Sequence, residues 1–190
     1  MGTGSASGII RAPGRLCYGA TDLTADFPHG GTALGFAREV VFEPRVQVAR
    51  SKAEEWGGTT SRVYYTGEEP RLACVFREVL DADMLSAMFP NIVSGSFGTS
   101  YIEYSPAAAG QNDPGYDLNA KAVKLVFSPY SPDYHPFVIL YHAFPAIDET
   151  TKLNLGLNAE IGVGAVWWAG VDSAGRCYKV GRRQELVSKL

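Results

Sequence analysis

The stretch Arg71-Leu72-Ala73-Cys74-Val75-Phe76-Arg77-Glu78 places an apolar side chain at every second position, at Leu72, Cys74 and Phe76. Successive side chains of a β-strand point to opposite faces of a sheet, so this spacing predicts a strand with one apolar face. The turn-forming sequence Thr-Gly-Glu-Glu-Pro occupies 66–70, and a shorter strand pattern occupies 62–65. The whole segment therefore predicts a strand, a turn and a second strand.

Similar runs between turn residues recur along most of the chain. The run at 45–50 alternates polar and apolar residues, which predicts a strand with one packed face and one wet face. The run at 136–144 is almost wholly apolar, which predicts a strand covered on both faces. Further strands are expected over 14–19, 32–42, 96–104, 120–128, 153–160, 161–168 and 177–180.

One helix is expected, over 81–89. Asp81 is a suitable N-cap, Asp83 adds negative charge to the first turn, and Pro90 ends the helix. A helix of about two turns needs a sheet to dock on. The elements together predict a mainly β fold, either a two-sheet β-sandwich or a barrel, with this one short flanking α-helix.

The segments between the strands complete a single domain over 1–190. We expect a flexible N-terminal arm over 1–13, a long loop over 50–62, a surface loop over 106–119 and a basic C-terminal tail over 182–190. Trp56 lies within the polar, glycine-bearing loop, where it either folds back onto the domain or awaits a partner surface.

Composition bounds the functions that the chain can have. Hydrophobic residues make up 46% and charged residues 19% of the 190 residues, which is typical of a globular protein with a sizeable core. The formal net charge is −3, so nothing favours tight nucleic-acid binding. No apolar run is long enough to cross a bilayer and the N-terminus lacks a signal-peptide pattern, so we expect no membrane partner and synthesis in a cytoplasm.

Cysteines and histidines do not form a metal-binding pattern. Cys17, Cys74 and Cys177 are widely separated in strand-like contexts and are interpreted as buried thiols. His142, in the apolar strand, is interpreted as a hydrogen-bonded core imidazole. His29 and His135 lie beside prolines in expected loops, and the aspartates are interpreted as helix-capping residues (Asp81, Asp83) and turn residues (Asp113, Asp117).

Motifs for catalysis and nucleotide binding are missing from the sequence. We find no G-x-S-x-G nucleophile elbow, no G-x-x-x-x-G-K-[ST] phosphate loop and no G-x-G-x-x-G dinucleotide motif. No nucleophile, base and orienting group can be named together. We therefore expect no catalytic residues, no cofactor and no enzyme activity.

The order of features resembles phage major tail tube proteins. The resemblance runs over about 41–181 and rests on the polar loop 52–60, the turn 65–70, the strand leading into an Asp-rich helix, and the closing segments 137–144, 153–160, 171–176 and 178–181. It implies a structural virion protein of the phage tail, in which six copies close a ring and rings stack into a tube that DNA passes through without specific binding. Its partners would be copies of itself and other tail proteins.

The resemblance also implies where subunits meet. In such proteins the long loop after the early strands reaches an adjacent subunit or ring, which places the interface residues here at Lys52, Glu54, Glu55, Trp56, Gly57 and Gly58. A closed ring would pair exposed sheet edges between neighbours, and an acidic protein suits a lumen that must not grip DNA.

Two other functions fit the sequence. A tail terminator or distal tail protein would share the fold and form one ring rather than a polymer. A monomeric β-sandwich that binds carbohydrate would use Trp56, or the pair Trp167 and Trp168, as a stacking platform.

Overall fold

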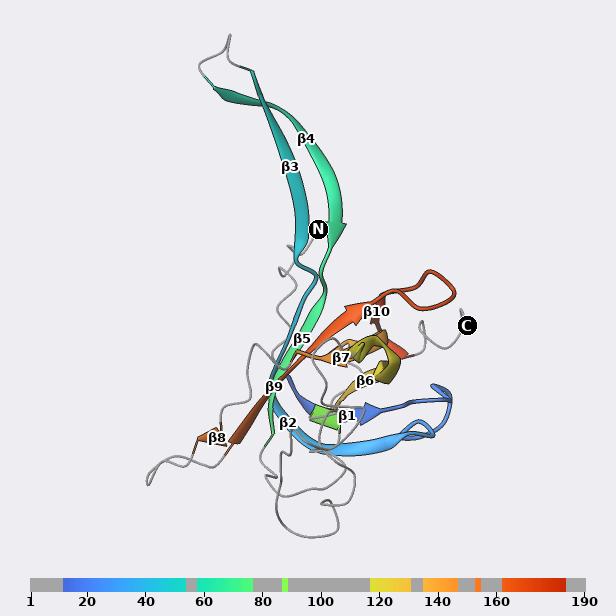
Figure 1. Cartoon of the computed structure of the whole chain (residues 1–190). Helices are drawn as coiled ribbons and strands as arrows, with labels where there is room; N and C mark the ends of the chain where they lie inside the picture. Colours follow the sequence, from blue (N-terminus) through green and yellow to red (C-terminus); the bar gives the residue numbers. More distant parts are fainter. Residues whose placement is uncertain are drawn as a thin grey trace, which may run out of the picture.

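A computed structural model describes residues 12–53, 58–76, 87–88, 117–130, 135–146, 153–154 and 162–183 (Figure 1). The strands are β1 (Ala12–Tyr18), β2 (Thr32–Glu43), β3 (Val46–Ala53), β4 (Thr59–Glu68), β5 (Arg71–Phe76), β6 (Val123–Pro129), β7 (Phe137–Pro145), β8 (Leu153–Asn154), β9 (Gly162–Gly170) and β10 (Tyr178–Gly181). A short 3-10 helix, η2 (Leu118–Lys121), precedes β6. The expected mainly β fold is confirmed.

Six of these strands close a barrel. Neighbours pair antiparallel in the order β7, β6, β1, β2, β5 and β9, and β9 then pairs with β7. One edge of β7 is divided between two partners, because 137–140 pair with β10 and 142–145 pair with β9. β10 and β8 are attached at the margins of the barrel, and β3 and β4 form a separate two-stranded sheet.

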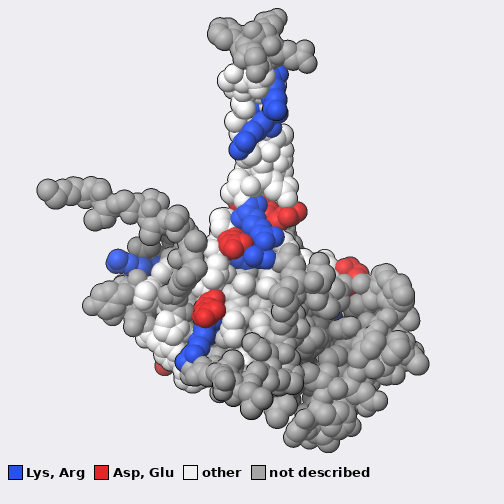
Figure 2. Space-filling view, turned by 90° about the vertical axis from the view of Figure 1, so that its left-hand side faces the viewer, with Lys and Arg blue, Asp and Glu red and all other residues white. Residues whose placement is uncertain are grey.

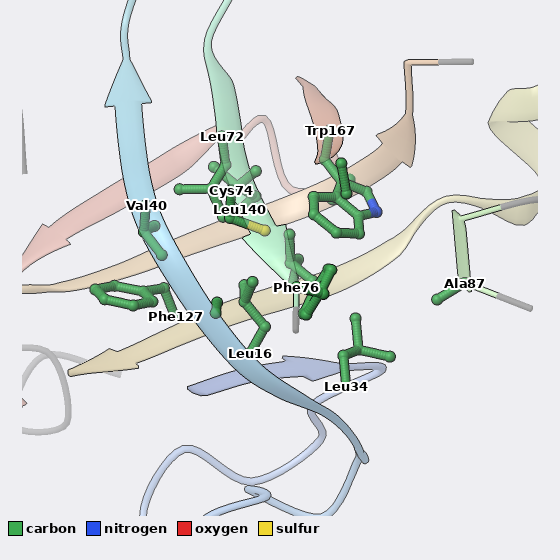
Figure 3. Packing of buried hydrophobic residues seen from close by; sticks show 14 of the residues in the cluster. Leu16, Leu34, Val40, Leu72, Cys74, Phe76, Ala87, Phe127, Leu140 and Trp167 are labelled. Carbon is green, nitrogen blue, oxygen red and sulfur yellow. The ribbon is translucent and has the colours of Figure 1, made fainter. Parts of the chain in front are cut away.

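The main core fills the interior of the barrel (Figure 3). Alternate residues of each strand point inward, as the spacing of Leu72, Cys74 and Phe76 predicts, and all three are buried. Trp167 of β9 is fully buried and packs its ring edge-on against Phe76, with the ring centroids 5.9 Å apart. Because apolar burial is the main favourable contribution to folding, this interior supplies most of the stability.

A second, smaller apolar cluster lies on the outer face of β1, β6 and β7. The connection 19–31 between β1 and β2 packs there. The cluster consists of Cys17, Ala20, Leu23, Val126, Phe137, Ile139 and Tyr141. β7 is therefore covered on both faces, which explains its continuous apolar sequence and confirms the expectation for 136–144.

Several expected boundaries are corrected. β1 begins at Ala12, inside the expected N-terminal arm, and β6 begins at Val123 because η2 occupies 118–121. Of the expected helix 81–89 only Ala87 and Met88 are described, and both are helical and buried. Most of the expected loop 106–119 and the expected strand 96–104 lie outside the described residues.

The expected loop over 50–62 is wrong. β3 continues to Ala53 and β4 begins at Thr59, so most of this segment is a paired hairpin. The expectation of one packed face for 45–50 is also wrong, because residues 45–50 are all exposed. The alternation at 45–50 identifies a strand correctly. The polar and glycine residues that follow are typical of a loop, so the sequence does not indicate that β3 and β4 remain paired up to Ala53 and Thr59.

Candidate functional site

The hairpin of β3 and β4, here called the arm, projects away from the barrel (Figure 1). Its strands pair only with each other, from Val46 opposite Glu68 to Ala53 opposite Thr59. Register shifts between Gln47 and Val48 and between Ser51 and Lys52 add one residue of β4 at each point. Such bulges increase the twist of a two-stranded ribbon.

The arm is exposed on both faces. Every residue of β4 is solvent-exposed except Gly67, which is half-buried, and residues 46–52 of β3 are exposed as well. Large apolar side chains are among them, with Val63 59% and Tyr65 65% exposed. An isolated two-stranded hairpin is marginally stable in water, so an arm with this composition gains from a covering partner.

The register sorts these side chains onto two faces. Residues directly opposite each other in an antiparallel pair point to the same side. Val48 is opposite Tyr65 and Arg50 is opposite Val63, so the first face of the arm carries Val48, Val63 and Tyr65. Tyr64 is opposite Ala49, on the second face, where it is half exposed.

The paired strands of the arm carry only basic charge up to Gly67, the residue before the terminal Glu68. Between Val46 and Ala53 and between Thr59 and Gly67 the sequence has three basic residues, Arg50, Lys52 and Arg62, and no acidic residue. Figure 2 shows basic side chains along the projecting hairpin and a mixture of basic and acidic side chains at its base. The two carboxylates of the arm's turn, Glu54 and Glu55, belong to residues that are not described.

Ion pairs at the base join the arm to the barrel. Glu43 at the end of β2 accepts hydrogen bonds from the Nε atoms of Arg71 (2.9 Å) and Arg45 (3.2 Å). The Arg71 hydrogen bond is the main reason that the pKa of Glu43 lies below its usual value. Arg45 adopts a left-handed backbone (φ 45°), and its guanidinium lies 5.2 Å from the ring centroid of Trp168. These contacts fix the direction in which the arm leaves the barrel.

A tyrosine from the far end of the chain also holds the base. Tyr178 of β10 donates its hydroxyl proton to Oε2 of Glu68, the last residue of β4, over 2.8 Å. Burial of Tyr178 and this carboxylate raise the pKa of Tyr178 to about 12. Its ring also packs against Phe42, so Tyr178 holds the base of the arm through a hydrogen bond and an aromatic contact.

Two of the predicted interface residues are described. Lys52 is an exposed strand residue opposite Thr60, and Gly58 has φ 79°, a conformation that favours glycine where the arm turns. Glu54, Glu55, Trp56 and Gly57 lie outside the described residues. The predicted interface did not include Val48, Val63 and Tyr65 of the arm, although the strand pattern at 62–65 was a usable signal.

The histidine interpretation is partly wrong. His29 lies in a connection between strands, as expected, but is only 2% exposed, while His142, expected in the core, is half-buried with its Nε2 2.7 Å from Oδ1 of Asn119. Nδ1 of His29 donates to the Ala25 carbonyl (2.9 Å) because a carbonyl only accepts, so in the neutral ring Nε2 accepts from the Ser128 hydroxyl (2.8 Å). Burial is the main cause that lowers the pKa of His29.

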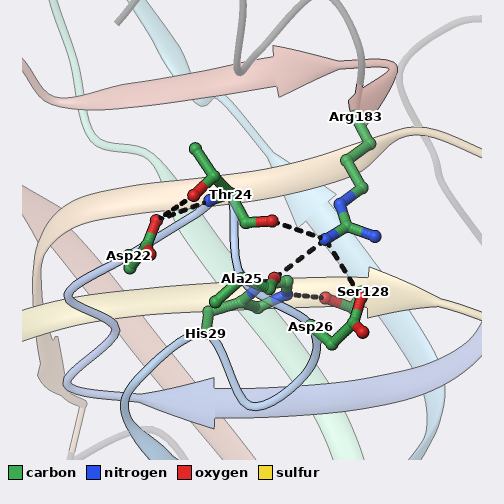
Figure 4. Close-up of polar contacts among 7 residues, drawn as sticks. All are labelled: Asp22, Thr24, Ala25, Asp26, His29, Ser128 and Arg183. Atoms are coloured by element: carbon green, nitrogen blue, oxygen red, sulfur yellow. Dashed lines mark hydrogen bonds and ion pairs between the residues drawn. The ribbon is translucent and has the colours of Figure 1, made fainter.

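Arg183, expected within the C-terminal tail, joins this polar cluster. Its Nη2 donates to the carbonyls of Ala25 (2.8 Å) and Thr24 (3.2 Å) and lies 3.5 Å from Oδ1 of Asp26 (Figure 4). The cluster thus joins the connection 19–31, β6 and the end of the chain, which are far apart in sequence. Sequence reasoning had no signal for it.

The other described candidate residues lie on barrel strands or on segments next to them. Trp167 is fully buried, which removes it as a sugar-stacking platform, whereas Trp168 is half-buried under Arg45. Cys17 and Cys74 are buried as expected, and Cys177 is half-buried. Asp117 caps η2 by accepting from the Asn119 amide over 2.9 Å.

Within the described part of the chain, no three metal-ligating side chains come together. No helix that the structure describes is long and apolar enough to span a membrane. No known protein-family model matches the chain, and no curated protein matches its sequence.

Proposed function

We propose that this protein is a structural subunit of a phage tail tube, which assembles with copies of itself into hexameric rings stacked as a hollow conduit for DNA. The observation that carries the proposal is the arm. It is a long hairpin, exposed on both faces and bearing large apolar side chains, on a barrel that needs nothing from it to close. A second copy is the partner that the resemblance to tail tube proteins implies.

The energetics of the arm support a role in assembly. Val48, Val63 and Tyr65 share one face, and burying such side chains in an interface contributes about 25 cal/mol per Å² of apolar area removed from water. An isolated monomer gains none of this free energy. The net charge of −3 and the absence of a basic excess suit a conduit through which DNA moves without being held.

The test compares assembly of the whole protein with assembly of arm variants. A variant that lacks residues 51–60 should keep the circular dichroism and thermal unfolding of the barrel but remain monomeric in light scattering, because none of the deleted residues that the structure describes belongs to either core. Normal rings or tubes from this variant would refute the role of the arm.

A matched pair of point variants makes the test sharper. Tyr65→Ser removes a ring from the face shared with Val48, and Tyr64→Ser removes the same group from the opposite face. We expect Tyr65→Ser to raise the concentration needed for assembly more than Tyr64→Ser does. Equal effects would show that the first face is not the one buried between subunits.

A further inference from the structure

A pocket of about 270 Å³ opens on the outer face of the barrel, beside the cluster of His29 and Arg183. Its lining includes Arg15 of β1, Phe27 and His29 of the connection 19–31, Ser128 of β6, Tyr130 and Arg183. We call it the Arg15 pocket. Arg15 lies directly across the ladder from Ser128 on one side and from Phe36 on the other, so it stands at the centre of a three-strand row.

The guanidinium of Arg15 is flanked by two aromatic rings. It lies 4.5 Å from the ring centroid of Phe27 and 5.4 Å from that of Tyr130. A ring attracts the guanidinium charge without accepting all of its N–H donors, so donors stay available for a carboxylate. Among the described residues, no carboxylate or carbonyl accepts a hydrogen bond from Arg15. The pocket therefore presents an oriented cationic fork.

Charge and apolar surface together define what would fit. The described lining carries two guanidinium groups and one carboxylate, that of Asp26, and burial lowers the pKa of His29, which favours its neutral form. Tyr130 packs against Phe36 with ring centroids 5.3 Å apart, and Phe36 is 52% and Tyr130 41% exposed. A ligand that combines a carboxylate with an aromatic ring matches both the cationic fork and the exposed rings.

One segment that combines carboxylates with an aromatic ring connects the two strands of the arm. The arm's turn reads Glu54-Glu55-Trp56-Gly57 between Ala53 and Gly58. We propose that the Arg15 pocket binds this acidic turn from a second copy of the protein, with Glu54 or Glu55 on the guanidinium of Arg15 and Trp56 on the rings of Phe36 and Tyr130. The inference rests on the proposed self-assembly and names the surface that receives the arm.

The turn cannot reach the pocket of its own subunit. Seven residue steps separate Val46 from Ala53, which carries Ala53 about 23 Å along the strand at 3.3 Å per residue. The five Cα–Cα steps from Ala53 to Gly58 allow the turn to return by at most about 10 Å. The pocket lies on the barrel, so an occupant with this sequence has to come from another molecule.

The experiment measures binding of a labelled peptide of residues 50–62 to the full chain by fluorescence anisotropy. We expect binding that weakens with salt and falls about tenfold or more in Arg15→Gln, because the peptide carboxylate loses its charged partner. A peptide with both glutamates changed to glutamine should bind as weakly to the unchanged protein. Arg182→Gln is the control, because it also removes one positive charge, at an exposed residue next to Arg183. This variant should bind the peptide like the unchanged protein.

Electron microscopy of the same proteins keeps the two proposals apart. Rings from the unchanged protein, with no effect of Arg15→Gln on peptide binding or assembly, would overturn the pocket assignment and leave self-assembly standing. Peptide binding that depends on Arg15 in a protein that never assembles would support the pocket and contradict the tail-tube proposal. Binding of inorganic phosphate at Arg15 without peptide binding would overturn the acidic turn as the occupant.

Discussion

Ser128→Ala should destabilise the fold although it removes a single oxygen atom. Ser128 is 6% exposed and its hydroxyl donates to Nε2 of His29 over 2.8 Å. His29 is itself buried, so the substitution leaves Nε2 without this partner. An unsatisfied buried group costs about 1–3 kcal/mol. For a domain of this size each kcal/mol lowers the Tm by about 2–4 °C, so we expect a decrease of about 2–12 °C.

The assay is equilibrium unfolding in urea at low protein concentration, followed by tryptophan fluorescence, to which the buried Trp167 contributes. Ser173→Ala, which removes an exposed hydroxyl from the turn before β10, is the matched control and should change the free energy of unfolding by less than about 0.5 kcal/mol. In a His29→Ala background, Ser128→Ala should cost less than in the unchanged protein. An unchanged midpoint in Ser128→Ala would refute the hydrogen bond as a source of stability.

Three further substitutions or conditions test the fold. Leu140→Ala opens a cavity at a fully buried position of the barrel and should lower the free energy of unfolding by about 2–5 kcal/mol, measured in urea; a loss below 1 kcal/mol would contradict the packing. Gly31→Ala places a methyl carbon 2.6 Å from the Tyr18 carbonyl oxygen and should cost about 1–3 kcal/mol or more in the same assay, whereas a neutral effect would contradict this close approach. Burial lowers the pKa of His29 below 6.5, so the unfolded chain binds the proton more tightly and stability is lost as pH falls below 6.5, by at most about 1.4 kcal/mol per pH unit. The free energy of unfolding should therefore fall more steeply from pH 7 to 5.5 in the unchanged protein than in His29→Gln. The same pH dependence in both proteins would refute this prediction.

Local sequence patterns predicted the strands well where the strand lies in the barrel and its apolar side chains face a core. The spacing of Leu72, Cys74 and Phe76 identified β5, and the apolar sequence of β7 indicated a strand covered on both faces; the structure confirms both. Alternation at 45–50 also identified a strand, but the period of two cannot tell whether a face meets a core or solvent. The projecting arm therefore could not be predicted from it.

The polar sites depend on contacts that local sequence does not encode. His29 precedes two glycines in a polar connection, yet that connection folds over β1, β6 and β7 and buries the ring against Ser128. Arg15 and Arg183 meet at one pocket from opposite ends of the chain. Sequence composition gave no reason to connect them, because they are brought together by the pairing of β1 with β6, of β6 with β7 and of β7 with β10, which joins segments far apart in the chain.

The central claim is that this protein assembles with itself through the arm, and negative-stain electron microscopy of the full chain over a concentration series tests it most directly. Light scattering on the same samples gives the mass of each species. The account predicts rings at moderate concentration and hollow tubes at higher concentration. A protein that remains monomeric at every concentration would contradict it.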